Sequence, residues 1–135
     1  MRVSALLFRS RELIQRDPSE VARIAVSGGA TVERGELVGE WKPVEPANAS
    51  MVDSAMVSSV ARALTQLTAA EFVDGRLQER VRVIEVSLDA TPLGDPATTR
   101  TLRLGKNCRA TLDDAPVVFA LPRSTCDILL STWWK

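Results

Sequence analysis

The sequence predicts an α+β fold, in which an antiparallel β-sheet with a meander in its C-terminal half packs against one long central helix. Two patterns carry this prediction: apolar residues alternate with period two over 21–26, 84–88 and 102–112, and an apolar stripe with helical spacing lies within 50–73. The chain has 135 residues, 45% hydrophobic and 25% charged, and its formal net charge is zero. This size and composition are typical of a globular domain, so we expect a single domain over 1–135.

Short strands joined by turns are expected in the N-terminal part. In chain order, we expect a strand over 3–8, a short helix or turn over 11–15, a strand over 21–26, a hairpin turn over 27–30 and an extended stretch over 31–41. Within the second strand, Ala22, Ile24 and Val26 share one face. A loop seam near 42–49 follows, because Pro43 and Pro46 interrupt regular structure.

The clearest helix covers residues 50–73. Ser50 is the expected N-cap, Asp53 completes a capping box, and Asp74 with Gly75 supplies the stop. The apolar stripe consists of residues spaced at i, i+4, i+8 and i+11, namely Met56, Val60, Leu64 and Leu67.

The outward face of this helix predicts a contact with another surface. Between Asp53 and Glu71 the only charged residue is Arg62, whereas a solvated helix face normally carries several charges. Trp133 and Trp134 add to this expectation, since adjacent residues on a strand point to opposite sides and tryptophan is enriched at interfaces. The alternative is that a local bend lets both rings cap the core. The candidate interface residues are Ser54, Ser58, Arg62, Thr65, Trp133 and Trp134.

An antiparallel meander is expected in the C-terminal half, with strands over 81–88, 101–112 and 117–121 and a last strand or short helix over 126–134. Val81 and Val83 face away from Ile84, which predicts a bulge or a strand start buried on both faces. If the strands pair across a turn at 113–116, Cys108 lies opposite residue 121.

Arginines gather on one predicted sheet face. Arg103 and Arg109 share that face, and Arg82 from the neighbouring strand joins them as a candidate polyanion contact. Residues 75–135 hold nine basic and seven acidic residues, an excess too small for a typical DNA-binding protein. A solvated face with cross-strand ion pairs is the simpler interpretation, and nucleic-acid binding is kept as a weaker alternative.

Catalysis is not expected, and neither is a metal or cofactor. The chain contains no histidine and no tyrosine, which removes most acid–base, triad and metal chemistry. The run 24–29, a strand that enters Ser-Gly-Gly, resembles the phosphate loop of ATP-pyrophosphatase-type adenylating enzymes, but Ala30 and Thr31 stand where that family has an Asp-Ser pair. Asp113 and Asp114 precede Ala-Pro, a common turn composition, so we interpret them as a turn.

The two cysteines leave the compartment open. Cys108 and Cys126 could form one disulfide in an exported protein or lie as two small buried apolar residues. No run reaches the roughly 18 apolar residues of a membrane span. We therefore expect a cytoplasmic or virion location, or an exported one if the cysteines are bridged.

These observations favour a non-catalytic, self-associating structural or assembly protein. Examples are a phage or viral structural subunit, or a small component of a secretion or envelope machine. Such a protein would form homo-oligomers or bind a protein partner. The alternative is a small ligand- or peptide-binding domain with an apolar pocket between helix and sheet.

Overall fold

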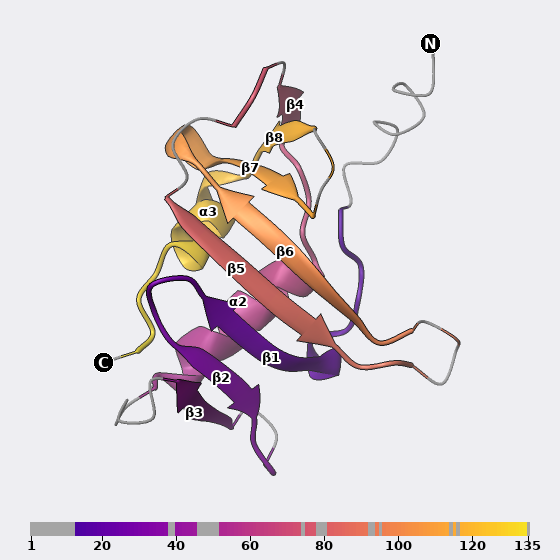
Figure 1. Cartoon of the computed structure of the whole chain (residues 1–135), viewed down its shortest axis with the longest axis vertical. Helices are drawn as coiled ribbons and strands as arrows, with labels where there is room; N and C mark the ends of the chain where they lie inside the picture. The colour runs from indigo at the N-terminus through magenta and orange to yellow at the C-terminus, as the bar shows by residue number, and fades with distance from the viewer. Residues whose placement is uncertain are drawn as a thin grey trace.

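The computed structural model describes residues 13–37, 40–45, 52–73, 75–77, 81–91, 94, 96–113, 115 and 117–134. In this part of the chain, eight strands form one antiparallel sheet in the order β3-β2-β1-β5-β6-β7-β8-β4 (Figure 1). The strands are β1 (Val21–Val26), β2 (Thr31–Arg34), β3 (Trp41–Glu45), β4 (Glu71–Val73), β5 (Arg82–Leu88), β6 (Thr98–Leu104), β7 (Arg109–Leu112) and β8 (Val118–Ala120). The helices are α2 (Ser54–Thr65), α3 (Arg123–Leu129) and the 3-10 turns η1 (Pro18–Glu20) and η2 (Lys106–Cys108).

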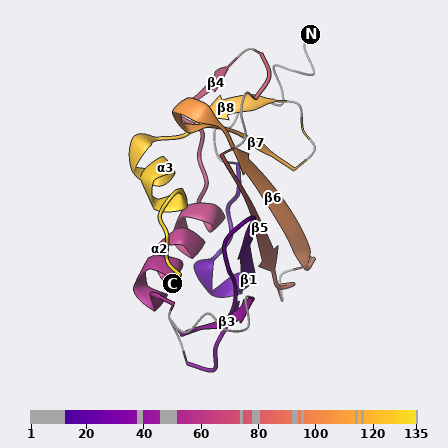
Figure 2. The same cartoon turned by 60° about the vertical axis from the view of Figure 1, so that its left-hand side comes forward.

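Two short helices cover one face of this sheet, and the core lies between the two layers. Figure 2 shows α2 and α3 on the same side of the strands. The inward side chains of the strands meet the buried sides of both helices and one C-terminal aromatic residue. The largest contributors are Ile24, Ile84, Leu102, Leu104, Phe119, Val60, Leu64, Leu129 and Trp133.

The prediction of one long central helix was wrong. The helix α2 has only 12 residues, and the part of the molecule that the structure describes is dominated by the antiparallel sheet. Asp53 caps α2, because its side-chain oxygen accepts a hydrogen bond from the Met56 amide at 3.1 Å. The chain leaves the helix after Thr65, and residues 66–70 then alternate between exposed and buried positions.

Pairing with an earlier segment explains where α2 ends. The Leu67 carbonyl accepts hydrogen bonds from the Leu13 and Ile14 amides, and the Thr65 carbonyl accepts one from the Arg16 amide. These contacts satisfy backbone groups that a longer helix would have used internally. Leu67 fits the helical stripe in the sequence, but it is buried as part of an extended segment that leads to β4.

The N-terminal strands agree with the sequence in most respects. The strand over 21–26 and the hairpin turn after it are confirmed, with Gly28 at φ +71° in that turn. The expected loop seam near 42–49 was wrong in its first part, since β3 occupies residues 41–45 and pairs with β2. Pro43 is tolerated there because β3 is an edge strand of the sheet. The expected strand over 3–8 and the rest of the seam lie outside the described residues.

The C-terminal meander is confirmed, but it contains one more turn than the sequence predicts. Residues 101–112 do not form one strand, because η2 separates β6 from β7, with Asn107 at φ 60° and Cys108 at φ 59°. The alternating pattern keeps its phase through this turn, which hides the turn in the sequence. Cys108 does lie opposite Leu121, whose amide donates to the Cys108 carbonyl at 2.8 Å. Residues 123–129 form a helix, the second of the two expected alternatives.

Candidate functional site

An open groove lies between α2 and α3 on the outer side of the helical layer. It has a volume of about 450 Å³. Seven residues line it, from the N-cap and first half of α2, the second half of α3 and the segment after α3: Asp53, Ala55, Met56, Ser59, Asp127, Ile128 and Ser131. The Asp53 amide donates to the Trp133 carbonyl at 2.9 Å, and Val52 forms a bridge with Trp134. The segment after α3 is thereby fixed to the start of α2. We call this feature the helix groove.

The helix groove has an apolar floor and acidic sides. Met56 and Ile128 are half-buried against the core, whereas Asp53 and Asp127 are exposed. Neither carboxylate forms an ion pair with another of the described residues. The groove therefore combines exposed apolar surface with two carboxylates that form no ion pair among the described residues, although exposed Arg123 lies one helical turn before Asp127 on α3.

The helix residues named from the sequence lie mostly elsewhere. Thr65 is 0% exposed, and its hydroxyl donates to the Ala61 carbonyl at 2.8 Å, so its assignment to an outward face was wrong. Ser58 turns toward the sheet and accepts a hydrogen bond from Trp41 Nε1 at 3.0 Å. Ser54 is half-buried, and only Arg62 of the four helix residues is exposed.

The outer face of α2 differs from the one that the sequence predicts, because Ala61 is buried. The sequence stripe placed Met56 in the core, but Val57 and Ala61 are buried beside Val60 and Leu64. Alanine has a small side chain that adds little to an apolar stripe, so Ala61 was not read from the sequence as part of the buried face, although alanine is often buried. Ala55 and Ser59, which line the helix groove, were therefore missed as site residues.

The terminal tryptophans pack within the chain. Trp133 is 2% exposed and belongs to the core, and Trp134 meets it edge to face with ring centroids 4.9 Å apart. Trp134 also lies directly on the β1–β2 turn, since a Cβ atom added at Gly29 would be 2.5 Å from its Cζ2 atom. This arrangement corresponds to the alternative in which both rings cap the core, and their candidacy as an interface loses its support.

Arg82 belongs to this C-terminal arrangement and not to an arginine face. Its guanidinium lies 5.3 Å from the centroid of the Trp134 ring, and its Nη1 donates to the Leu129 carbonyl at 3.0 Å and the Ser131 carbonyl at 2.8 Å. Burial lowers the pKa of this guanidinium. Arg82 therefore points to the helix side of the sheet, so its grouping with Arg103 and Arg109 was wrong.

Arg103 and Arg109 do lie together, on the helix-free face of the sheet. Both alternate with buried neighbours along their strands, and Arg103 pairs in register with Val83 of β5. Val81 precedes β5 on the same face and is 58% exposed. We call these four residues, Val81, Val83, Arg103 and Arg109, the sheet patch. The phase change at Val81 thus marks exposed apolar surface, neither a bulge nor a strand buried on both faces.

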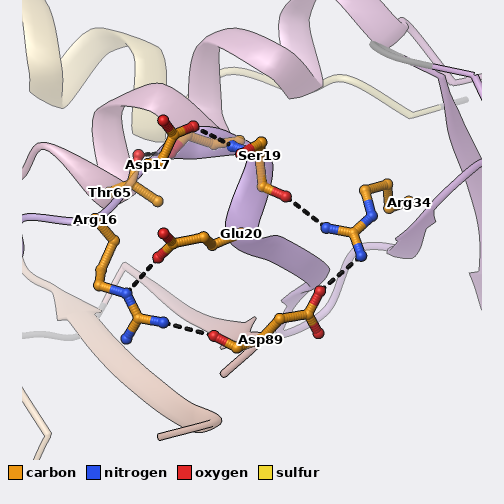
Figure 3. Close-up of polar contacts among 8 residues, drawn as sticks. Arg16, Asp17, Ser19, Glu20, Arg34, Thr65 and Asp89 are labelled. Carbon is orange, nitrogen blue, oxygen red and sulfur yellow. Dashed lines mark hydrogen bonds and ion pairs between the residues drawn. The ribbon is translucent and has the colours of Figure 1, made fainter. Parts of the chain in front are cut away.

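A polar network fixes the start of β1 to its neighbours (Figure 3). The guanidinium of Arg16 bonds the Glu20 carboxylate and the Asp89 carbonyl, and that of Arg34 bonds the Asp89 carboxylate at 2.6 Å. A cleft of about 550 Å³ adjoins the network, but its main charged groups already pair with each other. We therefore assign this cleft a structural role. The turn here is capped by Asp17, and its hydrogen bonds with Ser19 lower the pKa of that carboxyl.

An apolar pocket of about 210 Å³ lies at the other end of the sheet. We call it the strand pocket. Its lining comes from β4, β6, β7 and β8, from the β7–β8 connection, and from the segment before η1: Leu13, Phe72, Arg100, Leu112, Asp113, Ala115, Val117 and Phe119. Arg100 Nε bonds the Asp113 carboxylate at 2.7 Å, and Asp113 also accepts from the Thr101 amide. Asp113 lies in a turn at φ 55°, as expected, and Asp114 is outside the described residues. No residue of α2 contributes, so this pocket is not between helix and sheet.

Cys108 and Cys126 form a disulfide with their Cα atoms 5.6 Å apart. It joins the η2 turn to α3 and so fixes the helix that forms one side of the helix groove. Neither helix in the described ranges is long and apolar enough to cross a bilayer. In the same ranges, no three His, Cys, Asp or Glu residues lie close enough together to hold a metal ion.

Three hollows of the described chain and one exposed patch each have a distinct chemistry. The cleft is polar and internally paired, the strand pocket is small and apolar, and the helix groove and the sheet patch combine apolar surface with unlike charges. Comparison of the chain with protein families, curated proteins and solved structures finds no significant match.

Proposed function

We propose that this chain is a non-catalytic, self-associating structural or assembly protein. A phage or viral structural subunit, or a small component of a secretion or envelope machine, are the kinds of protein that fit. The single observation that supports the proposal most is the helix groove, where Met56 and Ile128 leave apolar surface open on the outer side of the molecule. An apolar groove with polar sides is typical of a protein contact site.

The composition of the helical layer supports the same proposal. A helix that meets only water is usually covered by charged side chains, but the outward positions of α2 are Ala55, Ser59 and Arg62, with Ala63 partly exposed. Small side chains let a partner approach the helix backbone closely. The disulfide fixes α3 beside α2, so the surface is preorganised before any partner arrives.

We further propose that the protein works in an oxidising compartment or on the outside of a particle. Disulfides persist in such places and are rare in a reducing cytosol. A thiol count on the denatured, non-reduced protein, isolated from its natural source, tests this. Blocked Cys108 and Cys126 support it, whereas two free thiols per chain contradict it.

Sedimentation velocity over a series of concentrations tests self-association. We expect the weight-average sedimentation coefficient to rise from low to high micromolar concentration. A strict monomer throughout this range would contradict the proposal. The matched variant is Ile128→Asp, which puts a third carboxylate into the groove and should lower association without opening the core, because Ile128 is only half-buried.

A small-ligand site is the second candidate function, and the strand pocket favours it. Its apolar lining ends at Arg100, whose Nε already bonds the Asp113 carboxylate, so the carboxylate of a small apolar ligand would have to share or replace that partner. Thermal shift against a panel of small carboxylic acids tests this candidate. Stabilisation that disappears in Arg100→Gln, in a protein that stays monomeric, would favour this function over self-association.

A further inference from the structure

The helix groove and the sheet patch lie on opposite layers of the molecule and carry opposite charges. The groove belongs to the outer side of α2 and α3, and the patch belongs to the helix-free face of the sheet. The groove presents Asp53 and Asp127 around apolar side chains, whereas the patch presents exposed Arg109 and half-buried Arg103 beside Val81 and Val83. Arg103 Nη1 donates to the Asp113 carbonyl, and exposed Glu85 lies next along the same face of β5. Among the residues that define the two surfaces, the groove is acidic and the patch is basic.

We propose that the sheet patch of one copy docks into the helix groove of a second copy, so that the chain associates head to tail. This proposal rests on the self-association proposed above and names the two surfaces that meet. The partner is a second copy of this chain because the chain itself carries both complementary surfaces. A contact between two different surfaces leaves one of each open on every pair, so association continues into a ring or a filament.

Shape and exposure fit this contact. Val81 is 58% exposed, the second most exposed of the large apolar side chains that the structure describes. It stands at the edge of the patch, where its amide donates to the Leu104 carbonyl and holds the backbone against the sheet. A fixed, projecting valine can enter an open groove of about 450 Å³ with room for flanking arginines. Burying such a side chain against Met56 and Ile128 removes apolar surface from water on both copies.

Charge favours this contact over either symmetric one. A groove-to-groove dimer would bring Asp53 and Asp127 of two copies together, and a patch-to-patch dimer would do the same for Arg103 and Arg109. Like charges placed opposite one another across an interface repel, and this repulsion selects against both arrangements. The zero net charge of the chain adds no general repulsion between copies.

Charge reversal on each surface tests the proposal. Asp127→Arg makes the groove formally neutral and places a positive charge where a patch arginine would dock, and Arg109→Glu makes the patch formally neutral and places a negative charge against the groove carboxylates. We expect each variant alone to associate at least about tenfold more weakly than the wild type, as charge pairs at interfaces do when broken. Mixed in equal amounts, the variants should associate with each other. The unaltered groove of the Arg109→Glu copy meets the unaltered patch of the Asp127→Arg copy, and in the other contact the introduced arginine faces the introduced glutamate.

The controls separate this proposal from the previous one. Glu36→Arg and Lys42→Glu reverse exposed charges near the β2–β3 connection, away from both surfaces, and should associate as the wild type does. The reversal variants should also melt at the temperature of the wild type, because Asp127 and Arg109 are exposed and form no ion pair within the described chain. Thermal melts followed by circular dichroism check that each variant is folded. A monomeric wild type would overturn self-association itself. A wild type that associates, with reversal variants that are unaffected or whose mixture gains nothing, would overturn only the head-to-tail contact.

Discussion

Two regions clamp segments onto the sheet, and they do so by different physics. Near the start of β1, Arg16 and Arg34 hold Glu20 and Asp89 through ion pairs; Arg34 and Asp89 are 42% and 47% exposed. After α3, Trp133 is buried and the disulfide ties α3 to the sheet. We refer to these regions as the ionic clamp and the aromatic clamp.

The different strengths of the two clamps explain why Trp133, Trp134 and Arg82, which the sequence suggests as binding residues, have structural roles here. The exposed Arg34–Asp89 pair defines geometry but contributes little free energy, because water and salt screen it, whereas the Arg16–Glu20 pair is screened less, since its side chains are only 12% and 22% exposed. A buried indole and a covalent bond contribute far more. The aromatic clamp therefore uses both tryptophans and Arg82 for stability, and surfaces with less conspicuous residues, such as Ala55 and Ile128, remain open for a partner.

The largest expected effect comes from breaking the aromatic clamp at its buried ring. Trp133→Ala should lower the free energy of unfolding by about 3–5 kcal/mol, since it removes a large side chain from the core and leaves a cavity. Chemical denaturation followed by circular dichroism measures this. Trp134→Ala is the matched control and should cost less, because that ring is only half-buried. Equal losses would show that the two rings do not differ in role.

Removing the disulfide should have the next largest effect. The double variant Cys108→Ser, Cys126→Ser opens a loop whose ends are 18 residues apart, which should lower the free energy of unfolding by about 3 kcal/mol. Denaturation with and without reductant measures the loss. The wild type in reductant should approach the double variant, and reductant should leave the double variant unchanged. A wild type that is insensitive to reductant would contradict a stabilising role for the bridge.

The sequence predicts this architecture well where a pattern has one interpretation. The strand over 21–26, its hairpin turn and the position of Cys108 opposite Leu121 all follow from period-two alternation and turn residues. It fails where one residue fits two patterns. Leu67 continues the helical stripe and also fits an extended segment, and only its pairing with Leu13 and Ile14, 53 or more positions earlier, decides between them.

The candidate site depends even more on contacts distant in sequence. Met56 and Ile128 meet at the helix groove because α3 folds back beside α2, and no local pattern brings them together. The sequence does identify the unusual lack of charge on α2, but it mistakes which residues face outward because Ala61 is buried. For the sheet patch, Arg103 and Arg109 follow from alternation. Arg82 was misplaced because its grouping with them overlooked that it shares its face of β5 with buried Ile84, where it meets the C-terminal segment.

Weakening the ionic clamp should have a smaller, salt-dependent effect. Asp89→Asn removes the charge opposite Arg34, which lies 2.6 Å away, and should lower the free energy of unfolding by at most about 1 kcal/mol. The difference should shrink as salt is added, unlike that of Trp133→Ala. Glu33→Gln is the control, because its contact with Arg23 is longer, at 3.5 Å, and also exposed. A salt-independent loss in Asp89→Asn would place this pair with the aromatic clamp.

The smallest effect should come from Asp17, the cap of the η1 turn beside the ionic clamp. Hydrogen bonds with Ser19 lower the pKa of Asp17 below its usual value of 3.8, so the ionised form is the one that folding favours. Its contribution should be fully present above the unfolded pKa and should disappear as pH falls through the lower folded pKa. The stability difference between the wild type and Asp17→Asn should therefore be constant near neutral pH and vanish only in strong acid. Denaturation at a series of pH values measures it, and a difference that grows as pH falls below 3.8 would contradict the assigned cap.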